Sequence, residues 1–185
     1  LTNETLGEHG QNEVKRGNKR QKTSASFINP HSQIACGGGI SSLKWQNPDT
    51  ILVGCYDHSI KVVNVEKSSV EEILFSNHKV ATSMDAIQDN LVLTGHEDAL
   101  VRLWDLRSGT NEKKFKSQYD AHTQWISQVK FNYNVENIFL SGSLDGSVKL
   151  WDLRNEDRPL TTLSKKDKSK EDDYKVFAVE WNGAS

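Results

Sequence analysis

The sequence predicts an all-β protein built from a repeated antiparallel unit, and three observations lead to this prediction. Residues 138–154 alternate apolar and polar side chains around Asp145-Gly146, which is the pattern of a β-hairpin with a tight turn. Glycine accepts the positive φ that such a turn needs, and aspartate can bond its own backbone there. Similar hairpins surround Asp57 and Asp98. The three aspartates are 41 and 47 residues apart, and a period of this length indicates one supersecondary unit per repeat.

Two of the hairpins carry a tryptophan followed by an aspartate, at Trp104 and Trp151. These pairs resemble the Trp-Asp dipeptide of WD-repeat β-propellers, whose blades are four-stranded sheets. In the first repeat Val63 stands where the tryptophan is expected. The resemblance implies a WD-repeat β-propeller with about three blades and the first strand of a fourth, as a fragment of a seven-bladed propeller.

The predicted domains and strands follow the repeat. We expect a flexible basic arm or inter-blade insertion at 1–30 and a partial propeller at 31–185, with blades at about 40–76, 77–120 and 121–164 and the start of the next at 174–182. Strands are expected at 40–46, 51–56, 59–65, 70–75, 80–87, 91–95, 100–106, 113–116, 126–131, 138–143, 148–153, 160–163 and 175–181.

Composition places the chain among globular proteins that do not span a membrane. Of its 185 residues, 35% are hydrophobic and 26% charged, and no apolar run approaches the roughly 20 residues of a membrane helix. Cys36 and Cys55 lack CxxC spacing, so neither a disulfide framework nor a zinc site is predicted. The chain begins with Leu1 and shows no signal peptide, and we expect it to be an intracellular fragment of a longer protein.

A basic cluster lies within the predicted arm. Its members are Lys15, Arg16, Lys19, Arg20 and Lys22. Such a cluster can act as a nuclear-targeting signal or contact RNA, and the alternative is a solvated linker.

Four residues of the third repeat fit positions that WD repeats join by hydrogen bonds. They are His122, Ser141, Asp145 and Trp151, and the counterparts are His78, Thr94, Asp98 and Trp104 in the second repeat and Asp57 in the first. A serine, a histidine and an aspartate also suggest a hydrolase. We favour the structural interpretation, because a serine nucleophile normally occupies an exposed elbow such as GxSxG, whereas Ser141 is expected within a strand.

Other candidate sites are weaker. His96-Glu97-Asp98 lacks the second ligand pair of a metal site, and a turn is the favoured interpretation. Residues 37–39 are three glycines without the strand and helix of a phosphate-binding loop. The sequence therefore predicts no catalytic residue, no metal and no cofactor.

Four residues are candidates for partner binding, each with a structural alternative. Trp125 and Lys175 occupy equivalent places before the innermost strands of two repeats, and an exposed tryptophan there is a candidate hot spot. The alternative is that Trp125 packs against a neighbouring blade. Arg107 and Arg154 follow the Trp-Asp strands, where they could bind an acidic partner or cap their strands in solvent.

The repeat at 122–154, the lysine-rich insertion from Lys165 and the strand DYKVFAVEW at 173–181 together resemble the WD repeat-containing protein twelve family, most closely its fungal members. The match corresponds to the C-terminal half of that family's propeller. The resemblance implies a non-enzymatic scaffold in large (60S) ribosomal subunit biogenesis and pre-rRNA processing, located in the nucleus, nucleolus and nucleoplasm. Its expected partners are a Bop-type WD-repeat protein and a Pescadillo homologue in the PeBoW complex, on the pre-60S particle.

Two alternatives remain open at this stage. The propeller could contact rRNA directly through 15–22 and through Lys165, Lys166, Lys168 and Lys170. It could also be another WD-repeat adaptor, such as a ubiquitin-ligase substrate receptor, because the repeat is shared by many functions. The family's N-terminal ubiquitin-like domain, which engages the midasin ATPase, has no counterpart in the chain, so that contact is not carried over.

Overall fold

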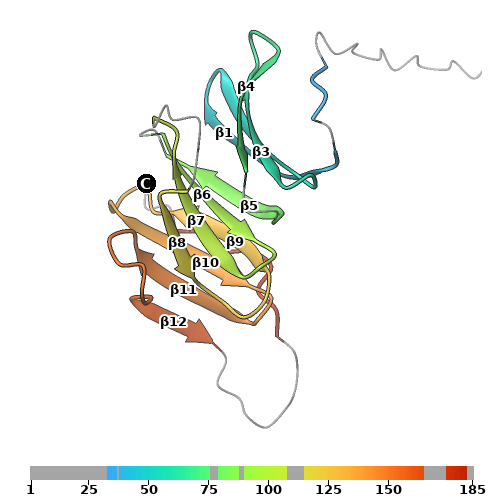
Figure 1. The fold of residues 1–185 in the computed structure, drawn as a ribbon. Helices are drawn as coiled ribbons and strands as arrows, with labels where there is room; N and C mark the ends of the chain where they lie inside the picture. The colour runs from blue at the N-terminus through green and yellow to red at the C-terminus, as the bar shows by residue number, and fades with distance from the viewer. Residues whose placement is uncertain are drawn as a thin grey trace, which may run out of the picture. The chain divides into compact units, whose positions relative to one another are not determined.

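The computed structural model describes residues 33–36, 38–75, 79–87, 90–107, 115–164 and 174–182. Within these ranges the chain forms three four-stranded antiparallel sheets and no helix (Figure 1). The predicted all-β fold is confirmed. The arm at 1–30, with its basic cluster, lies outside the described residues.

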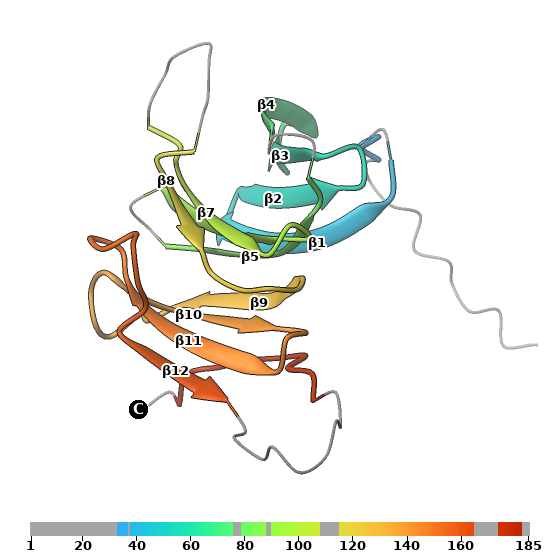
Figure 2. The ribbon, with the colours of Figure 1, turned by 60° about the horizontal axis from the view of Figure 1, so that its bottom comes forward.

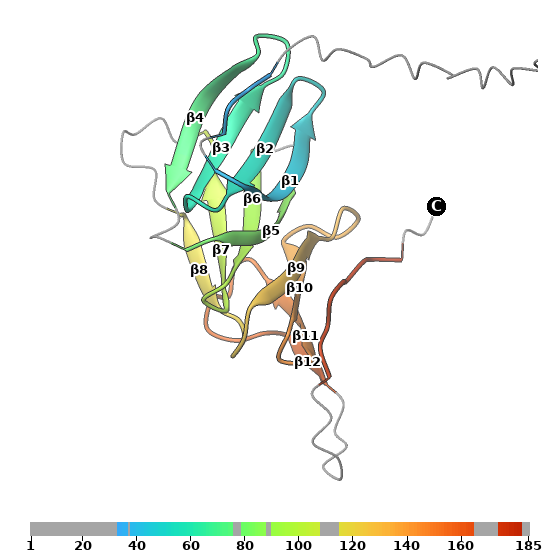
Figure 3. The same cartoon turned by 90° about the vertical axis from the view of Figure 1, so that its right-hand side faces the viewer.

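Each sheet is built from strands that follow one another in sequence. The first sheet comprises β1 (Ile40–Asn47), β2 (Thr50–Cys55), β3 (Ser59–Asn64) and β4 (Ser69–Phe75), side by side in this order (Figure 3). The second comprises β5 (Ala81–Ala86), β6 (Leu91–His96), β7 (Leu100–Asp105) and β8 (Ser117–Asp120). The third comprises β9 (Ile126–Phe131), β10 (Ile138–Ser143), β11 (Ser147–Asp152) and β12 (Thr161–Ser164), as Figure 2 shows.

The tight turns share one backbone conformation. The residue after the turn aspartate has a positive φ in every sheet, with values of 65° at His58, 67° at Ala99 and 80° at Gly146. Only the third repeat places glycine there, so the other two adopt a conformation that costs a side-chain-bearing residue about 1 kcal/mol. The turn geometry is therefore fixed by the hairpin and not by glycine alone.

The outer strand of the second sheet was misplaced by the sequence prediction. It was expected at 113–116, but β8 begins at Ser117, where Ser117 pairs with Leu103 and Tyr119 with Val101. The reason is burial: Tyr119 is fully buried in the interior between two sheets, whereas Phe115 contacts Trp104 from outside the strand. Apolar spacing alone did not distinguish these two aromatic residues.

The predicted strand at 175–181 is also not formed as a strand, because residues 174–182 pair with no strand of the described sheets. The segment nevertheless runs along the third sheet. The backbone N–H of Val176 donates to the carbonyl of Ser143 at 3.0 Å, and that of Val179 donates to Gln128 Oε1 at 3.0 Å. An innermost strand gains its ladder from the second strand of its own sheet, and no such strand is among the described residues.

The sheets pack face to face through two apolar cores, all within one compact unit spanning 32–185. Val92 and Leu93 are neighbours on β6, and they enter different cores because successive side chains of a strand point to opposite faces. The core between the first and second sheets includes Leu52 and Trp104, and the core between the second and third includes Trp151. The middle sheet is thus covered on both faces.

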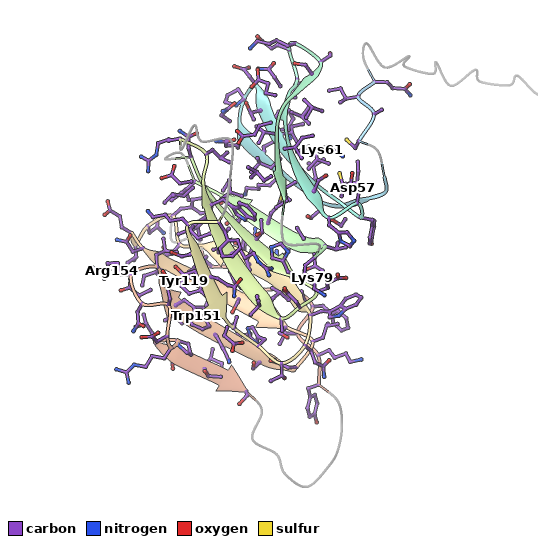
Figure 4. All side chains as sticks on the ribbon, in the orientation of Figure 1. Asp57, Lys61, Lys79, Tyr119, Trp151 and Arg154 are labelled. Carbon is purple, nitrogen blue, oxygen red and sulfur yellow. The ribbon has the colours of Figure 1, made fainter. Side chains whose placement is uncertain are left out.

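Aromatic rings fill the core between the second and third sheets. The rings of Phe139 and Trp151 are stacked with centroids 5.9 Å apart, and Tyr119 meets both edge-on at 5.0 and 5.6 Å. The Tyr119 hydroxyl donates to the carbonyl of Leu153 at 2.9 Å, so the one polar atom of this ring is satisfied. Figure 4 shows Tyr119 and Trp151 beside one another.

A glycine in the second strand of each sheet lets the next segment approach closely. A Cβ built on Gly54 would lie 3.0 Å from Met84 of β5, and one on Gly95 would lie 2.8 Å from the Cβ of Ile126 on β9. On Gly142 it would lie 2.8 Å from Val179. Residues 174–182 therefore contact the third sheet at the position where β5 and β9 contact the first and second.

Candidate functional site

The residues singled out in the third repeat form one continuous hydrogen-bonded chain. Trp151 Nε1 donates to Ser141 Oγ at 3.0 Å, and Ser141 Oγ lies 2.8 Å from His122 Nε2. His122 Nδ1 lies 2.9 Å from Asp145 Oδ2 and 3.0 Å from Ser147 Oγ. Because an ionised carboxylate only accepts, Nδ1 carries the proton, and the Ser141 hydroxyl then donates to Nε2. The chain links β10, β11, the turn between them and the loop before β9.

Burial sets the protonation of this chain. It lowers the pKa of His122, against the opposing influence of the Asp145 carboxylate, so the imidazole is neutral at pH 7. Burial is also the largest influence on Asp145, whose pKa it raises. Hydrogen bonds from Ser147 and from the backbone of Thr123 outweigh it, and the pKa of Asp145 falls to about 2. With a neutral His122 and an ionised Asp145, every donor in this hydrogen-bonded chain therefore faces an acceptor.

The hydrogen bonds run from Ser141 to His122 and from His122 to Asp145, as in a hydrolase triad. The Ser141 hydroxyl is nevertheless not placed to attack a substrate. Its side chain is fully buried, and the indole N–H of Trp151 occupies an oxygen lone pair that a nucleophile would need. In a serine hydrolase, the serine Oγ must be able to reach the carbonyl carbon of the substrate. The arrangement supports an internal anchor of the sheet.

The second sheet has a shorter version of this hydrogen-bonded chain. Trp104 Nε1 donates to Thr94 Oγ1 at 2.8 Å, and the histidine beside this hydroxyl is His96, with Nε2 at 2.7 Å. Burial, followed by the charge of Arg102, lowers the pKa of His96 to about 3. The predicted partner His78 lies outside the described residues. Sequence reasoning assigned His96 to the turn, yet His96 is the last residue of β6, two residues after Thr94 and on the same face.

The turn aspartates of the first two sheets pair with a cation four residues later. Asp98 Oδ2 lies 2.6 Å from Arg102 Nη2, and Asp57 Oδ2 lies 2.9 Å from Lys61 Nζ (Figure 4). Sequence reasoning missed both cations. Each cation is the third residue of the strand that follows the turn, so its spacing from the turn aspartate was a signal that sequence reasoning could have used.

The first sheet lacks the tryptophan anchor but keeps its turn. Val53 and Val63 occupy the anchor positions in a small apolar cluster with Cys55. Lys61 also donates to the carbonyl of Cys36 and lies 3.7 Å from Cys55 Sγ. The cation thus ties the segment before β1 to the sheet.

A second polar network joins the innermost strands of all three sheets. The Asp85 side chain is buried on β5, and its Oδ1 lies 2.7 Å from Lys44 Nζ of β1. Oδ2 accepts the backbone N–H of Phe131 on β9 at 2.9 Å, and the Tyr133 hydroxyl donates to Oδ1 at 2.8 Å. Burial lowers the pKa of Lys44, but the bonds and charge from Asp85 outweigh it, and the pKa is raised. Sequence reasoning did not identify this network, because its members lie on three different repeats.

Charged residues of alternating sign occupy one equivalent position in the innermost segments of successive repeats. Lys44 and Asp85 pair across the first two innermost strands, and Lys130 Nζ of β9 lies 2.8 Å from Glu180 Oε2. Trp181 Nε1 donates to the carbonyl of Lys130 at 3.3 Å. Opposite charges thus lie at equivalent positions of neighbouring repeats, where they attract one another.

The predicted partner-binding residues differ in availability. Trp125 is 55% exposed and Lys175 is exposed. Arg107 and Arg154 each fold back onto the aspartate two residues earlier, with Arg154 Nη2 at 2.5 Å from Asp152 Oδ2. Both arginine side chains stay exposed, at 58% for Arg107 and 73% for Arg154, so the partner-binding and strand-capping interpretations both stay predictions.

Cavities open on the described surface beside the turns and beside the innermost strands. One of about 530 Å³ is lined by Glu97–Ala99, Thr123–Trp125 and Leu144, next to the turns of the second and third sheets. The other, of about 630 Å³, is lined by Trp45, Tyr133 and Glu136, together with residues of the innermost strands and of the segments beside them.

Within the described ranges no three His, Cys, Asp or Glu side chains gather in a way that could hold a metal ion. The part of the chain that is described also has no helix with the length and apolarity needed to cross a membrane.

Comparison with known proteins bears on both the repeat and the family. The family model described as "WD domain, G-beta repeat" matches residues 113–152. The "Ribosome biogenesis protein WDR12 homolog" of Arabidopsis thaliana is 30% identical over 125 residues, covering 66% of this chain and 27% of that protein. The resemblance to the WD repeat-containing protein twelve family is confirmed.

Relatives of the same name occur in other organisms. The homologue of Dictyostelium discoideum is 28% identical over 108 residues, covering 58% of this chain and 22% of that protein. That of Drosophila mojavensis is 28% identical over 98 residues, covering 52% and 23%. The chain thus spans about a quarter of the length of these WDR12 homologues. The expected closeness to fungal members stays a prediction.

A solved structure supports the fold alone. The crystal structure of the computationally designed Ika8 protein aligns with a TM-score of 0.62 and 21% identity, covering 78% of this chain and 40% of that one. Together with the WD40 match and the three sheets, it agrees with a partial WD-repeat β-propeller.

Proposed function

We propose that this chain is part of a non-catalytic, protein-binding scaffold that acts in biogenesis of the large (60S) ribosomal subunit. The observation that supports it most is the match to proteins named ribosome biogenesis protein WDR12 homolog, from a plant, a fly and a slime mould. The fold is compatible with this role, because stacked four-stranded sheets present turns and loops on rigid supports.

The geometry of the third sheet supports the non-catalytic part of the proposal. The one Ser-His-Asp set among the described residues is buried, and its serine accepts a hydrogen bond from Trp151. These residues stabilise the sheet and leave no nucleophile exposed at that position.

Exposed aromatic residues support the protein-binding part. Trp45, Trp125 and Tyr133 are 50%, 55% and 60% exposed, and each lines a cavity at an end of the sheets. Tryptophan and tyrosine are the side chains that most often contribute strongly to protein interfaces.

The partners proposed are a Bop-type WD-repeat protein and a Pescadillo homologue, within a PeBoW-type complex on the pre-60S particle. A nucleolar and nucleoplasmic location accompanies this role. Contact with midasin is not proposed for this chain. Direct rRNA contact rests on 15–22 and 165–170, which lie outside the described residues, and it stays a prediction.

The test is affinity purification of the full-length protein that carries this chain, tagged in its own cells, followed by mass spectrometry and sedimentation. We expect the Bop-type and Pescadillo homologues to be enriched and the tagged protein to sediment with pre-60S particles. The control is an unrelated tagged nuclear WD-repeat protein of similar abundance. Recovery of neither homologue, with the tagged protein absent from the particle fractions, would contradict the proposal.

A further inference from the structure

The cavity next to the turns of the second and third sheets has walls that are fixed before any ligand arrives. The backbone N–H of Leu144 donates to the carbonyl of Trp125 at 3.0 Å, and Ser143 Oγ donates to the carbonyl of Gln124 at 3.0 Å. On the other wall the N–H of Glu97 donates to the carbonyl of Val80 at 3.3 Å. The turns on both sides are thus tied to their own sheets, which reduces the ordering cost of binding.

The cavity combines one aromatic face with one unpaired carboxylate. The Trp125 indole is 55% exposed, and no hydrogen bond from its Nε1 is formed with the described residues. Glu97 lines the same cavity from the turn after β6 and has no cation partner within the described ranges, since its Oε1 accepts only a long bond of 3.4 Å from the N–H of Val80. Asp98 adds less negative charge, because Arg102 already binds both of its oxygens.

These features select the chemistry of the ligand. A phosphate or a nucleic-acid backbone is disfavoured beside Glu97, because like charges repel in a partly desolvated site. An aliphatic side chain would leave the carboxylate unpaired. A guanidinium group can contact both groups of the cavity, because its flat face stacks on an indole and its N–H groups bond a carboxylate. A cavity of about 530 Å³ also falls within the range of small-ligand sites.

We propose that this cavity takes an arginine side chain presented by a partner protein, stacked on Trp125 and paired with Glu97. The inference rests on the proposed protein-binding function only in that the ligand belongs to a protein. It assigns that function a specific surface, between the turn after β6 and the loop before β9.

The probe is the peptide acetyl-Gly-Arg-Gly-amide, titrated into the isotope-labelled chain while the indole N–H signals are followed by NMR. We expect a saturable shift of the Trp125 signal, identified by its loss in Trp125→Phe. The same peptide with citrulline, which is neutral and of equal shape, should bind about tenfold more weakly. The buried indole signals of Trp104 and Trp151 report that the fold is retained.

Glu97→Gln keeps an oxygen for the bond from Val80 and removes the charge, and it should weaken the arginine peptide about tenfold. The matched control is Glu136→Gln, which removes a carboxylate at the other cavity and should leave binding unchanged. Equal binding of the arginine and citrulline peptides, an unaffected Glu97→Gln variant, or no shift at Trp125 would each overturn the inference. None of these outcomes depends on ribosomal partners, so the purification experiment above tests the proposed function separately.

Discussion

Replacing Ser141 by alanine tests whether the buried hydroxyl is a structural anchor. The substitution removes the acceptor of the Trp151 indole N–H and the donor to His122 Nε2, both at hydrogen-bond distance in a fully buried site. A buried polar group left without a partner costs about 1 to 3 kcal/mol. Since two groups are affected and His122 keeps Asp145, we expect the free energy of unfolding to fall by about 2 to 4 kcal/mol.

The assay is urea denaturation of the chain, followed by tryptophan fluorescence. With a urea m-value of about 2 kcal/mol per molar, the expected loss shifts the midpoint down by about 1 to 2 M. Ser141→Thr is the matched control, because threonine keeps the hydroxyl and Thr94 already makes the equivalent bond to Trp104 in the second sheet. If Ser141→Ala were as stable as the parent, or if it abolished a hydrolytic turnover without changing stability, the structural assignment would be wrong.

Three further predictions follow from contacts between and within the sheets. Gly95→Ala should destabilise by about 1 to 3 kcal/mol, because the new Cβ would lie 2.8 Å from the Cβ of Ile126. Asp85→Ala should destabilise by about 2 to 4 kcal/mol by leaving a buried N–H and a lysine unpaired, measured by the same denaturation. Lowering the pH from 7 to 5 should also destabilise, because burial holds the pKa of His96 and of His122 below the unfolded value near 6.5. The unfolded chain then binds more protons, and His96 alone, with its pKa near 3, accounts for a loss on the order of 2 kcal/mol at pH 5.

Each of these predictions has a control. Gly38→Ala should be neutral by comparison, because its Cβ would meet only Asp57, at an ordinary distance of 3.6 Å or more. Arg154→Ala, which removes an exposed ion pair, should leave the urea midpoint unchanged and so contrasts with Asp85→Ala. For the pH series, stability that stays constant between pH 7 and 5 would contradict the assignment of neutral, buried histidines. The turn aspartates do not interfere in this window, because the pKa of Asp57 and of Asp145 is lowered to about 2 and their contribution is lost only in stronger acid.

Local sequence was sufficient to predict most of the strands. The alternation around Asp145 and Asp98 and the recurring turn residues place the predicted ends of most strands within one residue of those observed. These features are encoded within a single hairpin, where turn chemistry fixes the register. There were two exceptions. The position of the outer strand β8 depends on the burial of Tyr119 against another sheet, and the segment expected as a strand at 175–181 has no partner strand among the described residues.

Contacts between repeats were not predictable in the same way. The network of Lys44, Asp85 and Tyr133 joins residues that lie 41 to 89 positions apart, and no local pattern relates them. The contact between His96 and Thr94 was not predicted either, because His96 was expected in the turn, whereas it is the last residue of β6. The spacing of repeats thus predicts the sheets, but the stacking of the sheets decides which polar side chains meet.

The most direct test of the account is hydrogen exchange of the five tryptophan indole N–H groups, measured by NMR. If the repeats are anchored by buried indoles, Trp104 and Trp151 exchange only through unfolding and are protected as strongly as the core strand amides. The half-exposed Trp45 and Trp125 should exchange quickly in the same sample. Rapid exchange of Trp104 and Trp151 in the folded chain would contradict the account.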